Sequence, residues 1–115
     1  MRRWDLRDFV GGWIVGDFDP SLVRTSFLEV GFKYMPRGVT EPLHYQRTAT
    51  EFTVVLVGTC QIGDEILEAN DILEIPPGQA ASFRALSDSL LAVVKVPSLP
   101  GDKVLGPTLG DEHGR

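Results

Sequence analysis

The stretch Gly38-Val-Thr-Glu-Pro-Leu-His44-Tyr-Gln46-Arg-Thr-Ala-Thr-Glu51-Phe-Thr-Val-Val-Leu-Val-Gly58 decides how this chain folds. His44 and Gln46 are two residues apart, so in a strand their side chains point to the same face. The next four residues predict a turn, and Glu51 opens a second run rich in β-branched residues. An antiparallel return would bring Glu51 opposite the face of His44 and Gln46. The spacing therefore predicts an imidazole, an amide and a carboxylate that point into a barrel.

Short apolar runs between glycines and prolines continue this pattern along the chain. Gly63-Asp64 predicts a two-residue hairpin, Asn70 a left-handed turn, and Pro76-Pro77-Gly78 ends the run before it. No window of ten or more residues has a helical repeat, and we expect at most one helical turn, near 5–10 or 20–24. The predicted fold is all-β: a sandwich, barrel or jelly roll. The expected strands are 12–15, 25–35, 51–57, 59–62, 65–67, 72–75, 81–85 and 89–96.

Length, charge and cysteine content narrow the class of protein. At 115 residues the chain is expected to form one domain over 1–115, and its net charge of −5 makes nucleic acid an unexpected partner. Cys60 is alone, which excludes an internal disulfide and fits a reducing compartment. No apolar stretch is long enough to span a bilayer, so we expect a cytoplasmic protein without a membrane partner.

Two spaced motifs resemble those of the cupins, a superfamily of double-stranded β-helix (jelly-roll) barrels. The first cupin motif is Gly, five residues, His-x-His, three or four residues, Glu, six residues and Gly. The range 38–58 matches this spacing, with Gln46 in place of the second His. The second motif resembles 70–81, with Asn70 in place of Gly and Ala81 in the position of a His. The resemblance implies a barrel core over about 25–97, with an N-terminal strand segment 1–24 and a C-terminal tail 98–115.

The resemblance also implies a degenerate metal site. Cupins usually present three His and one Glu to a divalent ion, and here only His44 and Glu51 are intact. Gln46 would offer a neutral oxygen, a poorer ligand than imidazole for most first-row metals, and Ala81 offers none. The expected cofactor is therefore either none or a weakly bound divalent metal (Mn, Fe, Ni or Zn) held by His44, Gln46 and Glu51. The other interpretation is a hydrogen-bonded polar cluster without metal.

A few further residues are candidates for ligand contact. Tyr34 and Phe83 could grip a ring beside the polar cluster, and Arg84 could bind an anion at the mouth of a pocket. Lys33 and Lys95 are interpreted as outward-facing strand residues, Cys60 as a small strand residue, and His113 as part of a solvated tail.

Three functions remain open on the sequence alone. The first is a binding module for a small polar molecule, a sugar or a carboxylate. The second is an enzyme of isomerase, lyase or dioxygenase type, with a metal or with His44 as general base oriented by Glu51. The third is a structural dimerisation barrel. Exposed strand edges and the apolar segment 12–15 predict a homodimer in each case.

Overall fold

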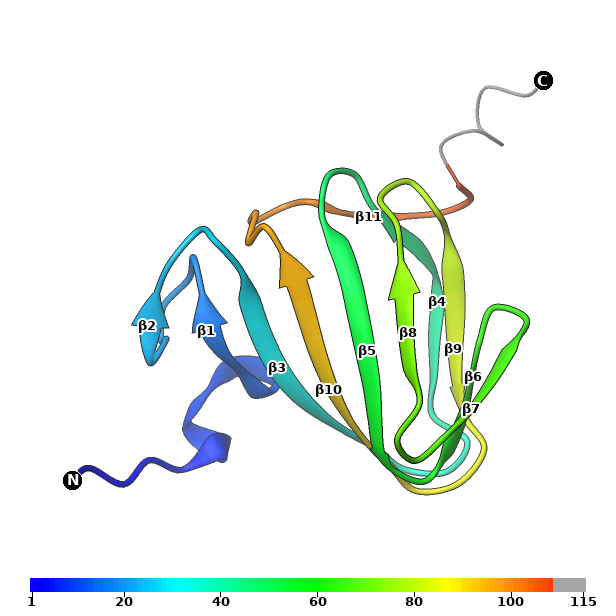
Figure 1. The fold of residues 1–115 in the computed structure, drawn as a ribbon, viewed down its shortest axis with the longest axis horizontal. Helices are drawn as coiled ribbons and strands as arrows, with labels where there is room; N and C mark the ends of the chain where they lie inside the picture. Colours follow the sequence, from blue (N-terminus) through cyan, green and yellow to red (C-terminus); the bar gives the residue numbers. More distant parts are fainter. Residues whose placement is uncertain (109–115) are drawn as a thin grey trace.

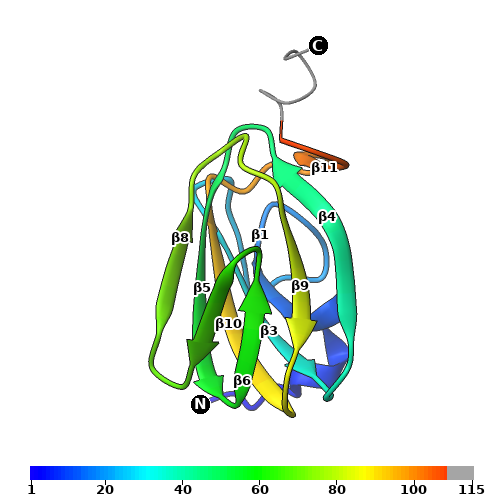
Figure 2. The ribbon, with the colours of Figure 1, turned by 90° about the vertical axis from the view of Figure 1, so that its right-hand side faces the viewer.

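The computed structural model describes residues 1–108, in which eleven strands form two facing sheets. In Figure 2 the sheets are the two layers of a jelly-roll barrel, so the all-β prediction is confirmed. Two short 3-10 helices precede the strands: η1 (Leu6–Asp8) and η2 (Val10–Gly12). The strands are β1 (Trp13–Gly16), β2 (Val23–Arg24), β3 (Glu29–Met35), β4 (Thr40–Gln46), β5 (Thr50–Val57), β6 (Thr59–Ile62), β7 (Glu65–Glu68), β8 (Ile72–Ile75), β9 (Ala81–Ala85), β10 (Ser89–Val96) and β11 (Lys103–Leu105).

Strand order shows how the chain alternates between the two layers. The first sheet has the order β2-β1-β3-β10-β5-β8, and the second has the order β11-β4-β9-β6-β7. All neighbours are antiparallel except β1 and β2, which are parallel. Figure 1 shows β1 and β2 at one edge, beside β3 and away from the strands of the second sheet.

The core lies between the sheets, where apolar side chains alternate along the central strands. Leu91 and Val93 of β10 pack with Val55 of β5 against Ile62 and Phe83 of the second sheet. All five are buried. Burying one such side chain stabilises the fold by about 1.5–3 kcal/mol.

The turns follow the sequence predictions. Gly63 has φ +57° in the hairpin between β6 and β7, and Asn70 has φ +80° before β8. β8 ends at Ile75, directly before Pro76-Pro77-Gly78. These turns join the strands that carry both motifs.

Two of the short strands were not predicted. Val23–Arg24 forms β2 in the range 20–24, one of the two places where the sequence predicts at most a helical turn, because it pairs with Val15–Gly16 of β1. Lys103–Leu105 forms β11 inside the predicted tail, because it pairs with His44–Gln46 of β4. Asp102, just before β11, is buried and accepts hydrogen bonds from the backbone N–H groups of Thr48 and Ala49. This part of the predicted tail therefore belongs to the fold.

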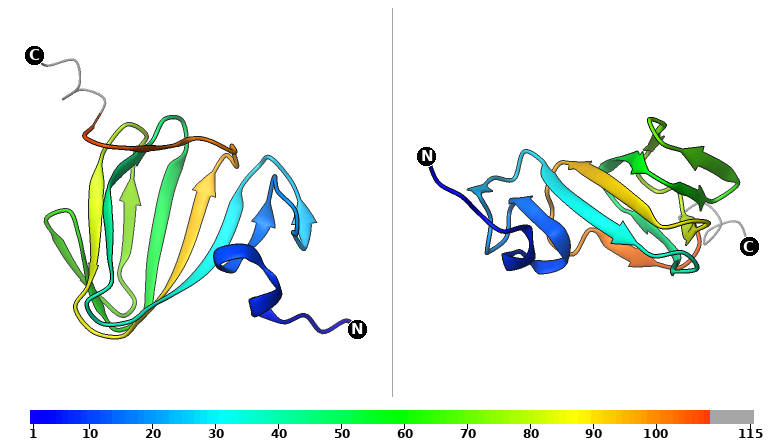
Figure 3. Two further views of the ribbon diagram at one scale, coloured as in Figure 1. Left: turned by 180° about the vertical axis from the view of Figure 1, so that it is seen from behind. Right: turned by 90° about the horizontal axis from the view of Figure 1, so that it is seen from below.

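The apolar alternation of β3 faces outward, which corrects the interpretation of Lys33 and Lys95. Trp13 lies on the inner face across Gly31, where a Cβ would come within 2.6 Å of its ring. The Nζ atoms of Lys33 and Lys95 lie 5.5 and 4.9 Å from the centroid of the same ring. Phe32 is on the opposite face, which the N-terminal segment covers (Figure 3). Lys33 and Lys95 are therefore inward.

The helices of the described residues are single turns. None in the range 1–108 is long and apolar enough to cross a membrane. The predicted solvated tail around His113 lies outside the described residues.

Candidate functional site

A cavity lies between the two sheets, toward the end of the barrel that β11 crosses in Figure 1. Its volume is about 50 Å³. His44, Gln46 and Ala81 line it from the second sheet, and Glu51 and Thr53 from the first. The pair on β4 and the carboxylate on β5 therefore face one cavity, although they belong to different sheets.

His44 is held in one tautomer by its own strand. The pattern of pairing shifts between Glu41 and His44, and the half-buried ring of His44 lies 2.8 Å, through Nδ1, from the carbonyl oxygen of Pro42. A carbonyl oxygen only accepts, so Nδ1–H is the donor. In the neutral ring the basic lone pair is then on Nε2. His44 can thus act as a proton acceptor at Nε2.

Gln46 presents a buried amide without a partner. The residue is only 6% exposed, and its Nε2 has no hydrogen-bond partner among residues 1–108. Its backbone is firmly held, because Gly78 N donates to Gln46 O at 2.7 Å and Lys103 is its register partner on β11. A buried donor without a partner costs about 1–3 kcal/mol. A fixed strand therefore holds an unsatisfied donor at the cavity.

Glu51 is oriented by its neighbour on the same face. The hydroxyl of the buried Thr53 donates to Glu51 Oε2 at 3.0 Å. Across the ladder, the register partner of Glu51 is Lys95 of β10. The carboxylate is thus fixed beside an ammonium group at the cavity wall.

All three lysines of the sequence, Lys33, Lys95 and Lys103, line this cavity. The Nζ atom of Lys33 lies 3.4 Å from Glu41 Oε2. Lys95 has no ion pair and no hydrogen bond to residues 1–108, and its Nζ lies over the Trp13 ring. Against the three ammonium groups the cavity has two carboxylates, those of Glu41 and Glu51. The cavity is therefore more positive than the chain as a whole.

Burial lowers the pKa of Lys95, because desolvation disfavours the charged amine. Glu51 and Glu29 oppose this shift, and Lys33 and Lys103 reinforce it. Glu29 is the register partner of Lys95 on β3, so the lysine lies between two glutamates in one row across the sheet. Lys95 is therefore a half-buried amine whose positive charge Glu29 and Glu51 compensate only in part.

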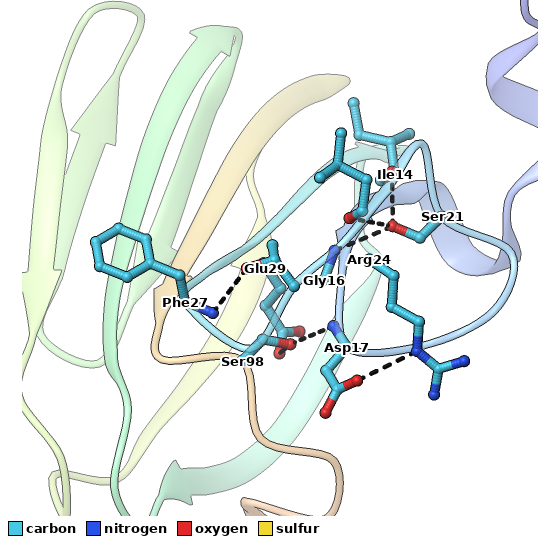
Figure 4. Close-up of polar contacts among 10 residues, drawn as sticks. Ile14, Gly16, Asp17, Ser21, Arg24, Phe27, Glu29 and Ser98 are labelled. Atoms are coloured by element: carbon cyan, nitrogen blue, oxygen red, sulfur yellow. Dashed lines mark hydrogen bonds and ion pairs between the residues drawn. The ribbon is translucent and has the colours of Figure 1, made fainter.

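Glu29, at one end of this row, is bonded to Ser98, and Figure 4 shows the contacts of Ser98 with Glu29 and Asp17. Ser98 is fully buried, and its hydroxyl donates to Glu29 Oε1 at 3.1 Å. The same hydroxyl oxygen accepts from the backbone N–H of Asp17 at 2.9 Å. These bonds tie the segment after β10 to β3 and to the loop after β1, which fixes the end of the strand that carries Lys95.

The donor set does not fit a cupin-type metal centre with three His and one Glu. Within residues 1–108, no group of three or more His, Cys, Asp and Glu side chains is placed to hold a metal ion. Ala81 is the register partner of His44 and lines the cavity without a donor atom. The Nε2 of Gln46 is a donor that lacks an acceptor, and lysine ammonium groups repel a cation.

Two of the predicted ligand contacts lie elsewhere, and one lies at the cavity. Phe83 is buried and lines the cavity. Arg84 is the next residue on β9 and points to the other face, where it lines a separate shallow hollow. Tyr34 follows Lys33 on β3, and successive side chains of a strand point to opposite faces. Because Lys33 points inward, Tyr34 points outward and is 64% exposed. Cys60 is a buried strand residue, as predicted, and burial raises the pKa of its thiol.

Sequence reasoning missed the lysines, although a signal was present. The chain has eight arginines and three lysines, and the seven arginines of the described range lie outside this cavity. A lysine in a strand is usually an outward residue. The signal is the alternation along each strand. Lys95 is two residues after Val93 on β10, and Glu51 is four residues before Val55 on β5, so each charged residue points to the same side as a buried valine.

Comparison with solved structures identifies the architecture. An uncharacterised protein with a double-stranded β-helix domain from Klebsiella pneumoniae is 18% identical, with a TM-score of 0.69, and the match covers 93% of each chain. An RmlC-like cupin from Desulfovibrio desulfuricans is 18% identical over 65% of this chain and 76% of that one, with a TM-score of 0.59. This chain has the cupin fold. No family model matches the sequence, and no curated protein is similar to it in sequence.

A third structure with the cupin architecture is an enzyme. Oxalate oxidase, in complex with the substrate analogue glycolate, is 21% identical over 68% of this chain, with a TM-score of 0.61. This chain spans 45% of the length of that protein. The cupin architecture predicted from 38–58 and 70–81 is thus confirmed.

Proposed function

We propose that the barrel cavity binds a small organic acid, whose carboxylate accepts hydrogen bonds from Gln46 and from Lys95. The observation that carries the proposal is the buried Nε2 of Gln46, which has no partner within residues 1–108. A carboxylate supplies the missing acceptor, and it accepts only, so it matches an amide N–H and an ammonium group together.

Charge favours an anion over a neutral ligand. Glu41 is engaged by Lys33, which leaves Lys95 and Lys103 facing Glu51. A cavity with an excess of positive charge raises the local concentration of anions, even in a chain with a net charge of −5. An acid therefore gains more from this cavity than a polar molecule without charge.

The size of the cavity supports one of the two ligand classes predicted from the sequence, the small acid. By the same measure of volume, one water needs about 10–15 Å³. The cavity of about 50 Å³ has room for roughly three to five waters. That matches a two- or three-carbon acid and is too small for a hexose. The oxalate oxidase of similar fold, solved in complex with glycolate, supports this class of molecule as the first probe.

The test is calorimetric titration of glycolate, with glycolamide as the uncharged analogue and glucose as the sugar. A ceiling of about 1.5 kcal/mol per non-hydrogen atom limits the Kd of glycolate to roughly a few micromolar or weaker. We expect saturable binding of glycolate, at least tenfold weaker binding of glycolamide and none of glucose. Equal binding of glycolate and glycolamide, or tighter binding of glucose, would contradict the proposal.

Comparing glycolate binding by two variants, Gln46→Leu and Gln61→Leu, tests whether the acid binds in the cavity. Gln46→Leu should weaken glycolate binding, because it removes the buried donor. Gln61→Leu is the matched control, since Gln61 lies outside this cavity and its Nε2 is satisfied by Gly63 O at 3.0 Å. Loss of binding in both variants to the same degree would show that a change of fold, not the amide, is responsible.

The tautomer of His44 favours a second function, a cupin enzyme in which His44 Nε2 is the general base. A weakly held Mn, Fe, Ni or Zn ion on His44, Glu51 and the Gln46 oxygen is the metal-dependent version of that enzyme. Elemental analysis of protein purified without chelator or affinity metal separates the two versions. Metal at near one per chain that is lost in His44→Ala would support the metal-dependent enzyme over the metal-free site.

A further inference from the structure

We propose that Lys95 is a nucleophile that forms a reversible imine with a small acid bearing a carbonyl group, such as a 2-oxo acid. The inference rests on the proposed function, because the acid must first be held in the cavity. It adds a covalent step and narrows the ligand class from carboxylates to carbonyl-bearing carboxylates.

The position of Lys95 singles it out among the three lysines. The Nζ of Lys33 is paired with Glu41, and Lys103 is exposed. Lys95 is half-buried, and its Nζ has no ion pair or hydrogen bond within residues 1–108. Its side chain also lines a second hollow of about 240 Å³, together with Gln46 and Lys103. Lys95 therefore lies on the wall between two hollows, and its amine has neither an ion pair nor a hydrogen bond within residues 1–108.

The residues around Lys95 suit an amine that must be neutral to react. Desolvation lowers its pKa, and the positive charges of Lys33 and Lys103 act in the same direction. Glu29 and Glu51 act in the opposite direction, because their negative charges favour the protonated amine. The Nζ of Lys95 also lies 4.9 Å from the centroid of the Trp13 ring.

Groups other than the nucleophile continue to hold the acid during the reaction. Once Lys95 has reacted, Gln46 Nε2 remains a donor to the carboxylate, and Lys103, its register partner, remains a positive charge beside it. Holding the acid in this way raises the effective concentration of the carbonyl carbon at the amine. The same cavity can thus bind the ligand and orient it.

The chemistry balances without an oxidant or a reductant. The neutral Nζ attacks the carbonyl carbon, a C–N bond forms, and the electron pair of the C=O π bond moves to oxygen, which takes the proton that the nitrogen then loses. A second proton on that oxygen lets it leave as water, while the nitrogen lone pair forms the C=N bond. In sum, an amine, a carbonyl and one proton give a protonated imine and water. Glu51, directly across the ladder from Lys95, can pass the protons.

The experiment traps the imine with sodium cyanoborohydride in the presence of glyoxylate and maps the adduct by peptide mass spectrometry. The chain has three lysines, so Lys33 and Lys103 are the internal controls for Lys95. We expect labelling of Lys95 to be several-fold faster than labelling of Lys33, because the Nζ of Lys33 is paired with Glu41. The label should saturate with glyoxylate, fall with added glycolate and disappear in Lys95→Met and Lys95→Arg.

The outcomes separate this inference from the proposed function. Equal labelling of Lys33, Lys95 and Lys103 in the folded protein, as expected after unfolding in denaturant, would overturn the imine. If glycolate still binds in that case, acid binding stands without the covalent step. Selective labelling of Lys95 that glycolate does not suppress would support a reactive amine and contradict a shared site for the acid.

Discussion

Replacing Gln46 by leucine should stabilise the fold and weaken acid binding. These opposite effects would show that Gln46 contributes to binding at a cost in stability. In the free protein the buried Nε2 has no partner within residues 1–108, which costs about 1–3 kcal/mol. Leucine has a similar size and no polar group, so Gln46→Leu recovers that free energy of unfolding. At about 4 °C per kcal/mol for a domain of this length, Tm should rise by about 4–12 °C.

Binding should change in the other direction. A hydrogen bond to a charged group contributes about 1.5–3 kcal/mol, so the Kd for glycolate should increase roughly ten- to 150-fold. The assays are thermal unfolding followed by circular dichroism and calorimetric titration of glycolate. Gln61→Leu should instead lower stability by about 0.5–1.5 kcal/mol and leave the Kd unchanged, because its amide already has a partner. A Tm for Gln46→Leu below that of the unmodified protein, with an unchanged Kd, would refute the reasoning.

Three further predictions concern the charge, the metal ligands and the assembly. Lys95→Met should raise stability by about 1 kcal/mol near pH 7, because the folded state then no longer buries an ammonium group. Since the pKa of Lys95 is lower in the folded than in the unfolded chain, the unmodified protein gains stability as pH rises between the two values. The advantage of the variant should therefore shrink above neutral pH in denaturant titrations, and an advantage that grows with pH would contradict this. Gln46→His combined with Ala81→His should raise bound Mn or Ni in elemental analysis, because position 81 is the register partner of His44, and unchanged metal content would contradict that placement. The predicted homodimer is checked by light scattering, where a monomer would contradict it.

Motif spacing predicted the barrel well because strand alternation and turn chemistry are local properties. Gly63, Asn70 and Pro76 each impose a backbone conformation or remove a donor, whatever the rest of the chain does. The spacing of His44, Gln46 and Glu51 places them at one cavity for the same reason. These parts of the fold need no information from distant residues.

The orientation of β3 could not be read from its own residues. Its apolar alternation at Val30, Phe32 and Tyr34 indicates a buried face, but that face lies outside the barrel. Trp13 covers the inner face through the space left by Gly31, a contact that only tertiary structure creates. Because the two faces of β3 are the reverse of those predicted, Lys33 lies at the cavity wall and not at the surface, and Tyr34 lies at the surface and not at the cavity.

Strands β2 and β11 were missed for a related reason. Each has two or three residues, too few to show a period, and each exists because a longer strand offers an edge for pairing. Lys103 enters the cavity wall only through the pairing of β11 with β4. The position of Lys103 therefore depends on pairing between distant segments. The positions of His44, Gln46 and Glu51, in contrast, could be predicted from their spacing in the sequence.

A crystal structure of the protein soaked with glycolate tests the central claim most directly. We expect the carboxylate inside the barrel, with its oxygens within hydrogen-bond distance of Gln46 Nε2 and Lys95 Nζ. A cavity in which glycolate is absent, or in which its carboxylate points away from both groups, would contradict the claim that this barrel binds small organic acids.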